Sequence, residues 1–302
     1  MSTVFIGTSD FAAAVLERLA FAEGHRPALV LTRPDRPRGR GQRLSSPPVA
    51  ERARALGLPL EQPERINDEA VVAMIGALSD PPPTVVVCAF GALIADPLLS
   101  AQEILNVHPS LLPRWRGAAP IERAIMAGDE QTGVSIMRLT EGLDSGPVCL
   151  EAPEPIDPRD TYGTLAGRLQ ELGATLLLRA LDERPPFQEQ DERGVTYAEK
   201  IGPADRSLKP TQPAQELERV VRALHPHIGA RLEIGSEQPL GVLQAQVADD
   251  ETVPAGQLLE RDGRLLLGCL PGTLELTEVK PAGGRAMTAA EYLRGHGLPG
   301  RA

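Results

Sequence analysis

The sequence has few aromatic residues and no long hydrophobic run. Only 3% of its 302 residues are aromatic, and Trp115 is the single tryptophan. The longest apolar run, residues 85–95, has 11 residues and contains Gly91, whereas a membrane-spanning helix needs about 20. The first residues show no basic stretch ahead of an apolar core, which is how a secretory signal begins. We therefore expect a cytoplasmic protein without a membrane segment.

Cysteine is also scarce. The three cysteines, Cys88, Cys149 and Cys269, are too few and too scattered for a disulfide framework or a four-ligand zinc site. We expect three reduced, packed thiols and no metal. No G-x-G-x-x-G follows the first apolar run, which disfavours a nicotinamide-dependent enzyme. No serine or cysteine lies in a nucleophile-elbow motif, so nothing in the sequence requires a covalent intermediate.

The charge of the chain is acidic overall but basic in one place. The formal net charge is −10, which gives no general help toward polyanions. Residues 33–43, however, hold five arginines against one aspartate, a local charge of +4. Such a segment is typical either of a solvated arginine-rich loop or of a surface that contacts a polyanion.

Apolar runs alternate with amphipathic helical segments over the first 180 residues. Helices are expected after Asp10 as the N-cap, over 120–127, and along a leucine-rich stretch near 165–177. Strands are expected at 3–6, 28–31, 84–90, 104–108 and 133–139. This alternation predicts an open α/β sheet, in which ligands bind beyond the carboxyl ends of the strands.

The length favours about two domains. Residues 182–194 contain two prolines and seven charged residues, which indicates a linker or an exposed turn. One helix (215–224) and several short strand-like pieces follow, and they predict a small β-rich domain, which we expect to be a barrel. The predicted organisation is a domain over 1–182, a linker over 183–204 and a second domain over 205–302.

Three polar residues stand out at predicted strand ends. Asn106 and His108 are two residues apart on one strand and so point to the same side. Asp144 lies in a glycine-flanked turn after the next strand. A strand-end pair satisfied by the next loop, and an Asx-turn, would explain these residues structurally. Their convergence at the mouth of one sheet, beside the loop at 110–121, instead predicts a reactive site with an apolar wall.

The segments NVHPSLLPRWRGAAPI (106–121) and TGVSIMRLTEGLDSG (132–146) resemble the signature of the folate-dependent formyltransferases. That superfamily includes glycinamide ribonucleotide transformylases, sugar-amine formyltransferases and formyltetrahydrofolate hydrolases. Further segments resemble the members that act on methionyl-tRNA: GTSDFAAAVLERL, RPDRPRGRGQRL, VTYAEKI (195–201) and KPAGGRAM (280–287). The resemblance covers about residues 3–293.

This resemblance implies a Rossmann-like formyltransferase domain followed by a small OB-like β-barrel domain. It implies 10-formyltetrahydrofolate as formyl donor, the methionine α-amine on initiator Met-tRNA as acceptor, and no metal, membrane or protein partner. The matching catalytic residues are Asn106, His108 and Asp144. The matching folate-binding residues are Phe90, Gly91, Ala92, Leu93, Ser110, Leu111, Leu112 and Pro113. The tRNA-contacting loop contains Arg36, Arg38, Arg40 and Arg43.

The second domain departs from what such a family would require. Residues 205–302 carry 11 basic and 13 acidic side chains, whereas a tRNA-binding barrel is expected to be basic. RSLKP (206–210) also stands where the family commonly has an Asp-Trp pair. We therefore expect the arginine-rich loop at 33–43 to provide much of the tRNA contact.

Three other functions remain open. A formyltransferase acting on an amino sugar-nucleotide would share Asn106, His108 and Asp144, but would lack the basic loop and the KPAGGRAM tail. A formyltetrahydrofolate hydrolase would use water as acceptor and usually has a regulatory domain in front, which we do not expect ahead of Thr3. A non-catalytic folate- or nucleotide-binding module would not need all three polar residues.

Overall fold

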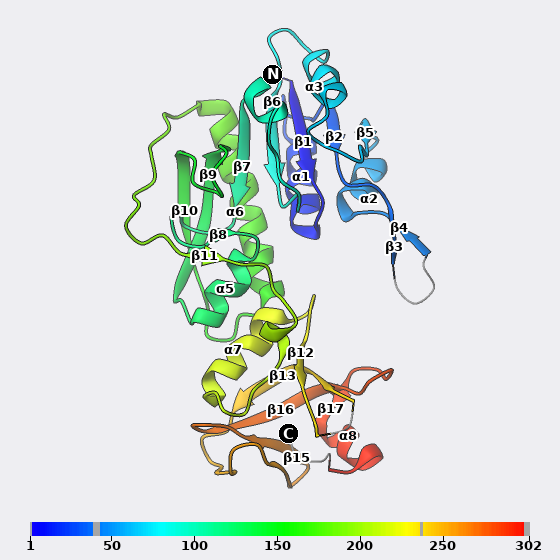
Figure 1. The fold of residues 1–302 in the computed structure, drawn as a ribbon, viewed down its shortest axis with the longest axis vertical. Coiled ribbons are helices and arrows are strands. Elements are labelled where there is room, and N and C mark those ends of the chain that lie inside the picture. Colours follow the sequence, from blue (N-terminus) through cyan, green and yellow to red (C-terminus); the bar gives the residue numbers. More distant parts are fainter. Residues whose placement is uncertain (1, 39–42, 236–237, 299–302) are drawn as a thin grey trace. The chain divides into compact units, whose positions relative to one another are not determined.

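A computed structural model describes residues 2–38, 43–235 and 238–298 of the chain (Figure 1). Contacts between Cα atoms divide the chain into two compact units. Unit 1 comprises Met1–Pro120, Thr132–Glu154 and Ala166–Ala198. Unit 2 comprises Ile121–Gln131, Pro155–Leu165 and Glu199–Ala302. The predicted domain limits at 182 and 205 stay a prediction.

Unit 1 is built on a seven-stranded sheet in the order β10-β9-β7-β6-β1-β2-β5. Its central strands are parallel, and their nearly continuous Val, Ile and Leu runs suit strands that are covered on both faces. The open α/β sheet expected from the sequence is thus confirmed. The strands are β1 (Thr3–Gly7), β2 (Leu29–Leu31), β5 (Leu60–Glu61), β6 (Thr84–Cys88), β7 (Ile104–His108), β9 (Gln131–Arg138) and β10 (Val148–Pro155).

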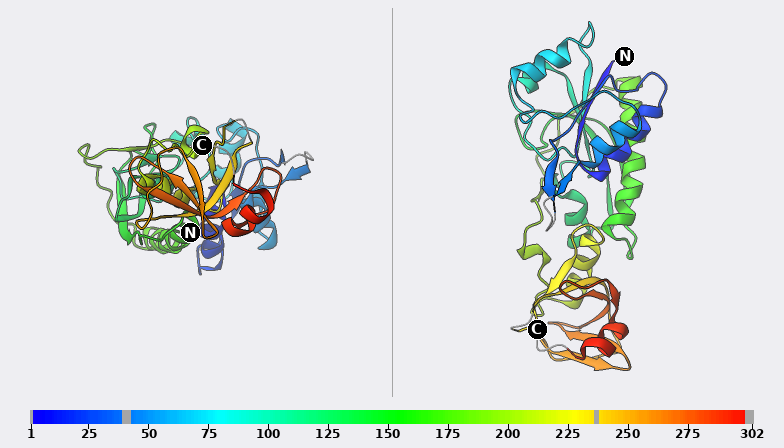
Figure 2. Two further views of the ribbon diagram at one scale, coloured as in Figure 1. Left: turned by 90° about the horizontal axis from the view of Figure 1, so that it is seen from below. Right: turned by 90° about the vertical axis from the view of Figure 1, so that its right-hand side faces the viewer.

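Helices cover both faces of this sheet. Figure 2 shows α1 and α6 on one face and α3 on the other. The face under α3 has a buried core in which Val4, Val85 and Ile104 pack with Val71 and Ile75. The helices of this region are α1 (Asp10–Phe21), α2 (Pro48–Ala55), α3 (Glu69–Gly76), α4 (Leu98–Ala101) and α6 (Tyr162–Glu183).

The N-cap of α1 is Ser9, and the expectation that Asp10 caps the helix was wrong. The Ser9 hydroxyl accepts a hydrogen bond from the Ala12 N–H at 3.3 Å, a contact worth about 1 kcal/mol. Asp10 is instead the first helical residue. Its carboxylate there interacts favourably with the positive end of the helix dipole.

The strand β9 does not end at the mouth of the sheet, where the sequence placed the turn that follows it. β9 is antiparallel to β7, with Leu105 opposite Arg138 and His108 opposite Ser135. The carboxyl end of β9 therefore lies beside the start of β7, away from His108. Leu139, the next residue, packs against the core under α3. The loop at 139–147 therefore starts at that end and folds back to bring Asp144 against Asn106 and His108, so Asp144 is not placed by a strand end at a common rim.

The segment predicted to be a linker is extended and hydrogen-bonded within unit 1. Gln188 forms a bridge with Val148. Further along, β11 (Tyr197–Ala198) pairs in parallel with β8 (Arg116–Gly117). The second pairing, together with the contacts of Gln190 and Glu192 with Arg116, places residues 190–198 against the loop that follows β7. A two-stranded hairpin, β3 (Arg36–Arg38) and β4 (Arg43–Ser45), carries part of the basic segment.

Unit 2 contains an antiparallel sheet in the order β12-β13-β16-β15-β14, with β17 on β16. The helix α7 buries Leu217, Val221 and Leu224 in the core of this unit, together with Leu276 of the sheet. The elements of unit 2 are α5 (Pro120–Ala127), the 3-10 helix η1 (Ala204–Arg206), α7 (Ala214–Leu224), β12 (Ala230–Leu232), β13 (Leu240–Val247), β14 (Leu258–Arg261), β15 (Arg264–Gly268), β16 (Thr273–Lys280), β17 (Met287–Thr288) and α8 (Ala289–His296). A β-rich second region is thus confirmed, although the sequence patterns missed β13 and α8.

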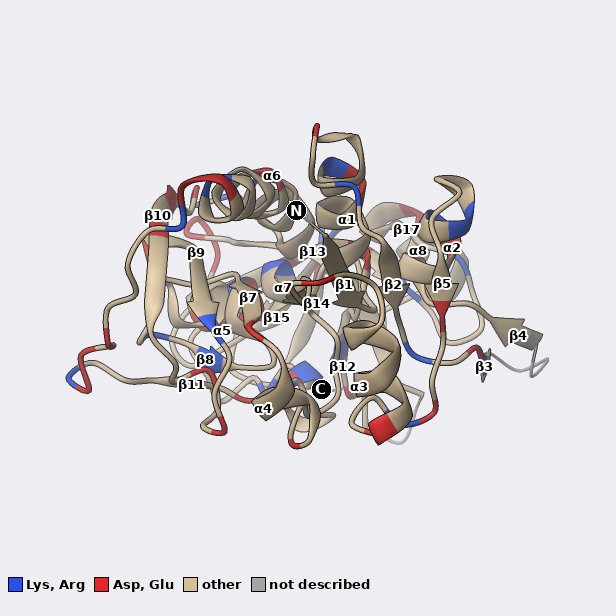
Figure 3. Cartoon of the chain, turned by 90° about the horizontal axis from the view of Figure 1, so that it is seen from above, with Lys and Arg blue, Asp and Glu red and all other residues tan. Residues whose placement is uncertain are grey.

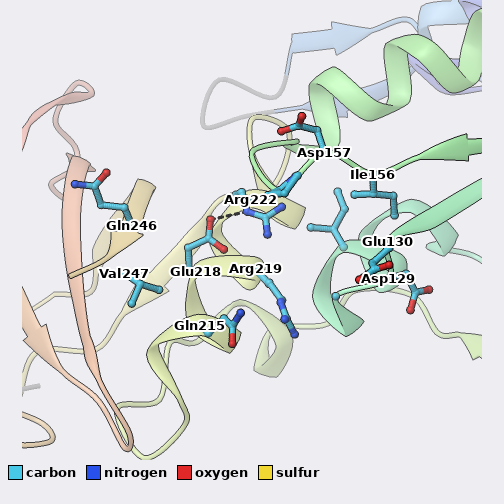
Figure 4. A pocket seen from close by; sticks show the side chains of 13 residues that line it. Asp129, Glu130, Ile156, Asp157, Gln215, Glu218, Arg219, Arg222, Gln246 and Val247 are labelled. Atoms are coloured by element: carbon cyan, nitrogen blue, oxygen red, sulfur yellow. Dashed lines mark hydrogen bonds and ion pairs between the residues drawn. The ribbon is translucent and has the colours of Figure 1, made fainter. Parts of the chain in front are cut away.

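Unit 2 also contains a polar cavity of about 420 Å³ (Figure 4). Arg219 and Arg222 of α7 line it, together with acidic residues that include Asp157 and Glu218. The Arg222 Nε donates to Glu218 at 2.5 Å, so the two charges partly neutralise each other. Among the residues that the structure describes, none that we predicted to act in catalysis or binding lines this cavity.

Candidate active site

The three polar residues singled out in the sequence meet in unit 1. Asn106 and His108 lie on β7 and are 7% and 4% exposed. The Asn106 Nδ2 donates to Oδ1 of Asp144 at 3.4 Å. The Nδ1 atom of His108 lies 3.7 Å from Oδ2 of the same carboxylate. The structure therefore brings the three predicted residues together, with Asn106 and His108 both facing the carboxylate of Asp144.

The His108 ring is held from its other side. Its Nε2 lies 2.8 Å from the carbonyl oxygen of Trp115. Because a carbonyl oxygen can only accept, Nε2 carries the hydrogen and donates it. In the neutral ring, Nδ1 is then the nitrogen that can take up a proton. Its 3.7 Å separation from Oδ2 of Asp144 is too long for a direct hydrogen bond, but it is close enough for the carboxylate to attract the protonated ring.

The Asp144 carboxylate has a third neighbour in the loop after β7. The Gly117 N–H donates to Oδ2 of Asp144 at 2.8 Å. Gly117 has φ +123°, and a Cβ atom there would come within 2.8 Å of the Ala198 carbonyl oxygen. Only glycine lets the backbone pass so close to β11 while its N–H points at the carboxylate.

The loop expected to bind folate directly after β7 is tightly folded. Ser110 is fully buried, and its hydroxyl donates to the Arg114 carbonyl oxygen at 2.6 Å. The Ser135 hydroxyl of β9 donates to the Ser110 carbonyl at 2.8 Å and accepts from the Leu112 N–H at 3.2 Å. These contacts fix the path of residues 110–113. Their role in folate binding stays a prediction.

The second predicted folate-binding segment, residues 90–93, follows β6. The Thr8 hydroxyl donates to the Phe90 carbonyl at 2.7 Å, and the Arg33 Nη1 donates to the Gly91 carbonyl at 2.8 Å. Phe90 is buried, whereas Gly91, Ala92 and Leu93 are exposed. The loop is therefore held at its base by two long-range contacts, and it presents an apolar tip to solvent.

The basic segment is only partly within the described structure. Arg40, and the side chains of Arg38 and Arg43, lie outside the described residues. Arg36 is exposed and pairs with Glu64, with Nη2 and Oε2 3.2 Å apart. Elsewhere on the chain both signs of charge are interspersed, as Figure 3 shows along α6. The predicted contact of these arginines with tRNA stays a prediction.

Sequence reasoning missed three groups that hold the site. These are the Trp115 carbonyl, the Gly117 N–H and the side chain of Gln190, whose Nε2 donates to the Asp144 carbonyl at 2.8 Å. The two backbone groups have no side-chain signal, and the glycine at position 117 is the one local indication of a close backbone approach. Gln190 lies in a charged stretch without periodicity, so no local pattern could indicate it.

Cys88 and Cys269 are not placed for nucleophilic chemistry. Cys88, at the end of β6, is fully buried, and this burial raises the pKa of its thiol far above the ordinary range. Burial also raises the pKa of Cys269 to about 11. Both thiols therefore stay protonated near neutral pH, and a thiol in that state is a poor nucleophile.

Within the described residues, no cluster of three or more His, Cys, Asp or Glu side chains could hold a metal ion. No helix in that part of the chain is both long and apolar enough to span a membrane.

Two family models match most of the chain. Residues 1–181 match the family described as Formyl transferase, and residues 200–297 match the family described as Formyl transferase, C-terminal domain. The methionyl-tRNA formyltransferase of Halorhodospira halophila is 46% identical, over 98% of this chain and 96% of its own length. The corresponding protein of Cereibacter sphaeroides is 42% identical, over 99% of this chain and 97% of its own length.

A solved structure shares the fold at low sequence identity. The N-formyltransferase of Helicobacter canadensis, in complex with folinic acid and dTDP-3-aminofucose, has a TM-score of 0.65 and 14% identity. The similarity covers 91% of this chain and 98% of that one. At this identity the likeness concerns the fold alone. Both matched regions and the near full-length identity to curated relatives lead to one assignment: the chain belongs to the methionyl-tRNA formyltransferase family.

Proposed function

We propose that this protein transfers the formyl group of 10-formyltetrahydrofolate to the α-amine of methionine on initiator Met-tRNA. The observation that carries the proposal is the convergence of Asn106 and His108 on the Asp144 carboxylate. The sequence identity of over 40% to methionyl-tRNA formyltransferases supports the choice of acceptor. The product, formyl-Met-tRNA, would serve translation initiation in the cytoplasm, and three free cysteines fit that reducing compartment.

The reaction needs an oxyanion to be stabilised and a proton to be moved. When the amine attacks the formyl carbon, the carbonyl oxygen becomes an oxyanion, and the C–N bond to the folate nitrogen then breaks. The Asn106 amide is a fixed neutral donor for that oxyanion. His108 Nδ1 is placed to take the proton of the attacking amine, and Asp144 faces it to stabilise the resulting cation. The Asp144 carboxylate then relays this proton from His108 to the departing folate nitrogen, so that charge balances.

The folate co-substrate would lie between the two loops that flank the site. Residues 90–93 offer apolar side chains and main-chain groups on one loop, and residues 110–113 offer them on the other. The contacts of Thr8 and Arg33 with the first loop, and of Ser135 with the second, keep both loops in place before any ligand binds. Such preorganisation lowers the entropy that binding would otherwise cost.

A turnover assay tests the proposal directly. The chain is supplied with 10-formyltetrahydrofolate and either Met-initiator tRNA, uncharged tRNA, an amino sugar-nucleotide or no acceptor, with Asp144→Ala as control. We expect formyl-Met-tRNA only with charged tRNA and the unchanged carboxylate. Consumption of 10-formyltetrahydrofolate without an acceptor would indicate a hydrolase. Formylation of the amino sugar-nucleotide alone would favour the sugar-nucleotide reaction. Either result would contradict the proposal.

Removing the Arg40 side chain should weaken the affinity for Met-tRNA while leaving the affinity for folate unchanged. One lost phosphate contact reduces the slope of log affinity against log salt by about one. We therefore expect Arg40→Ala to raise KM for Met-tRNA and flatten its salt dependence. Arg18→Ala is the matched control, because Arg18 is an exposed arginine of α1 paired with Glu171 of α6. Equal effects of the two substitutions on KM would mean that only overall charge matters.

A further inference from the structure

One side chain from a distant segment holds the turn that carries Asp144. The Gln190 Nε2 donates to the carbonyl oxygen of Asp144 at 2.8 Å and to that of Gly146 at 2.7 Å. A side-chain amide has two N–H donors. Both donors of Gln190 are therefore used on this single turn, 44 to 46 residues earlier in the chain.

The other end of the Gln190 amide connects to the opposite side of the same carboxylate. Its Oε1 accepts from Nε of Arg116 at 3.0 Å. Arg116 directly precedes Gly117, whose N–H donates to Oδ2 of Asp144 at 2.8 Å. Gln190, Arg116, Gly117 and Asp144 thus close a ring of contacts. This ring holds both the main chain and the carboxylate of Asp144.

Arg116 has little freedom to leave this arrangement. It is 4% exposed, and its Nη2 lies 3.2 Å from Glu192, two residues beyond Gln190. A buried guanidinium must keep its hydrogen-bond partners, because leaving them unmade is costly. The pairing of β8 with β11 adds main-chain contacts on the same two segments. The residues of the ring are therefore held by two segments that are paired with each other.

The turn itself needs such support. Asp144 has φ +44°, a left-handed conformation that is uncommon for residues other than glycine, although Asp adopts it more readily than most. A strained conformation of this kind persists only when its surroundings hold it. The two carbonyl contacts from Gln190 are made at this residue and two positions after it. Losing them would let the turn relax and the carboxylate move.

We infer that Gln190 is a positioning residue that acts through Asp144. It sets the orientation of the carboxylate toward His108, and its side-chain amide touches no reacting atom. This inference rests on the proposed formyl transfer at the same site. It adds a residue of the segment at 184–198 to the active site, although that segment is distant in sequence from all three polar residues.

The test compares two substitutions that add the same charge on one segment. Gln190→Glu keeps the shape and the Arg116 contact but replaces both donors with an acceptor. Gln188→Glu is the matched control, because the side chain of Gln188 is exposed and only its backbone pairs, with Val148. We expect Gln190→Glu to lower kcat about 10- to 100-fold, since small misplacements at a site have effects of this size. KM for folate and Met-tRNA should stay within about twofold in both variants. An unchanged kcat in Gln190→Glu would overturn the inference.

A double variant separates positioning from general destabilisation. In an Asp144→Asn background, measured in single turnovers with enzyme in excess, Gln190→Glu should change the rate by less than about twofold. The same loss in both backgrounds would mean that Gln190 does not act through the carboxylate, and would contradict the inference.

Hydrogen exchange of the Gly117 amide gives a readout that needs no substrate. We expect exchange about tenfold faster in Gln190→Glu and unchanged in Gln188→Glu, because the contact with Asp144 loosens. Equal exchange in both variants would overturn the positioning role. A wild-type chain that forms no formyl-Met-tRNA would instead contradict the proposed function, and the exchange result would still decide whether Gln190 holds the turn.

Discussion

Asn106→Ala is expected to lower kcat by about 10²–10³-fold, which corresponds to about 2.7–4 kcal/mol of transition-state stabilisation. Asn106 is buried on β7, and its amide lies against the Asp144 carboxylate, with Nδ2 and Oδ1 3.4 Å apart. A donor that the fold already orients toward the reaction centre needs no reorganisation when the oxyanion forms. Alanine removes that donor and leaves the strand intact. The measurement is kcat together with the thermal unfolding midpoint, which should change little.

Val107→Ala provides the matched control for Asn106→Ala. Val107 is the neighbouring residue of β7 and is also buried, but it lies on the opposite face of the strand. Removing its methyl groups should destabilise the fold by about 1–3 kcal/mol while the folded enzyme keeps its kcat. If Asn106→Ala retained near-full kcat, Asn106 would have no part in the mechanism.

Asp144→Asn is expected to lower kcat by about 10²–10⁴-fold, the usual contribution of a positioned acid or base. The two carboxylate oxygens accept from different donors, Nδ2 of Asn106 and the N–H of Gly117. Asparagine has one oxygen and one NH₂ group, so one of these donors must face another donor in either orientation. The substitution also removes the negative charge that faces His108.

The pH dependence of kcat checks the role of Asp144 as a proton relay. We expect the profile of Asp144→Asn to lose one limb, because the pair with His108 no longer exchanges a proton. Asp182→Asn is the control, since Asp182 also faces a histidine, His25, with Oδ1 2.8 Å from Nε2. That pair lies outside the candidate site, so kcat and its pH profile should match the wild type. An unchanged profile in Asp144→Asn would count against the relay.

The sequence determined five of the seven strands in the unit 1 sheet, all but β5 and β10, and the placement of two of the three polar residues. Apolar runs bounded by glycine and proline predicted β1, β6 and β7 to within about two residues, because buried parallel strands have a strong local signal. The same spacing rule placed Asn106 and His108 on one side of β7. The helix α5 was also expected with its observed limits, because proline at the first helical position is a local signal.

Other features were decided only by the tertiary structure. The direction of β9 follows from long-range pairing with β7, and hydrophobic periodicity carries no information about strand direction. The return of the loop at 139–147, and with it the place of Asp144, depends on that direction. Local propensity favoured Asp10 as a helix cap as readily as Ser9, and the backbone conformation at Ser9 decided between them.

No local sequence pattern predicted the groups that hold the polar residues of the site in place. Gln190, the Trp115 carbonyl and the Gly117 N–H reach the polar residues of the site from loops, over separations of up to 46 residues. A charged, proline-containing stretch predicts an exposed linker, because its composition cannot form a core. Hydrogen bonds to β8 and to the turn at Asp144 instead draw it against the site. The sequence therefore determined which groups could carry the chemistry. Long-range hydrogen bonds decided how these groups are held. Such bonds join residues that are far apart along the chain, and local propensity carries no information about them.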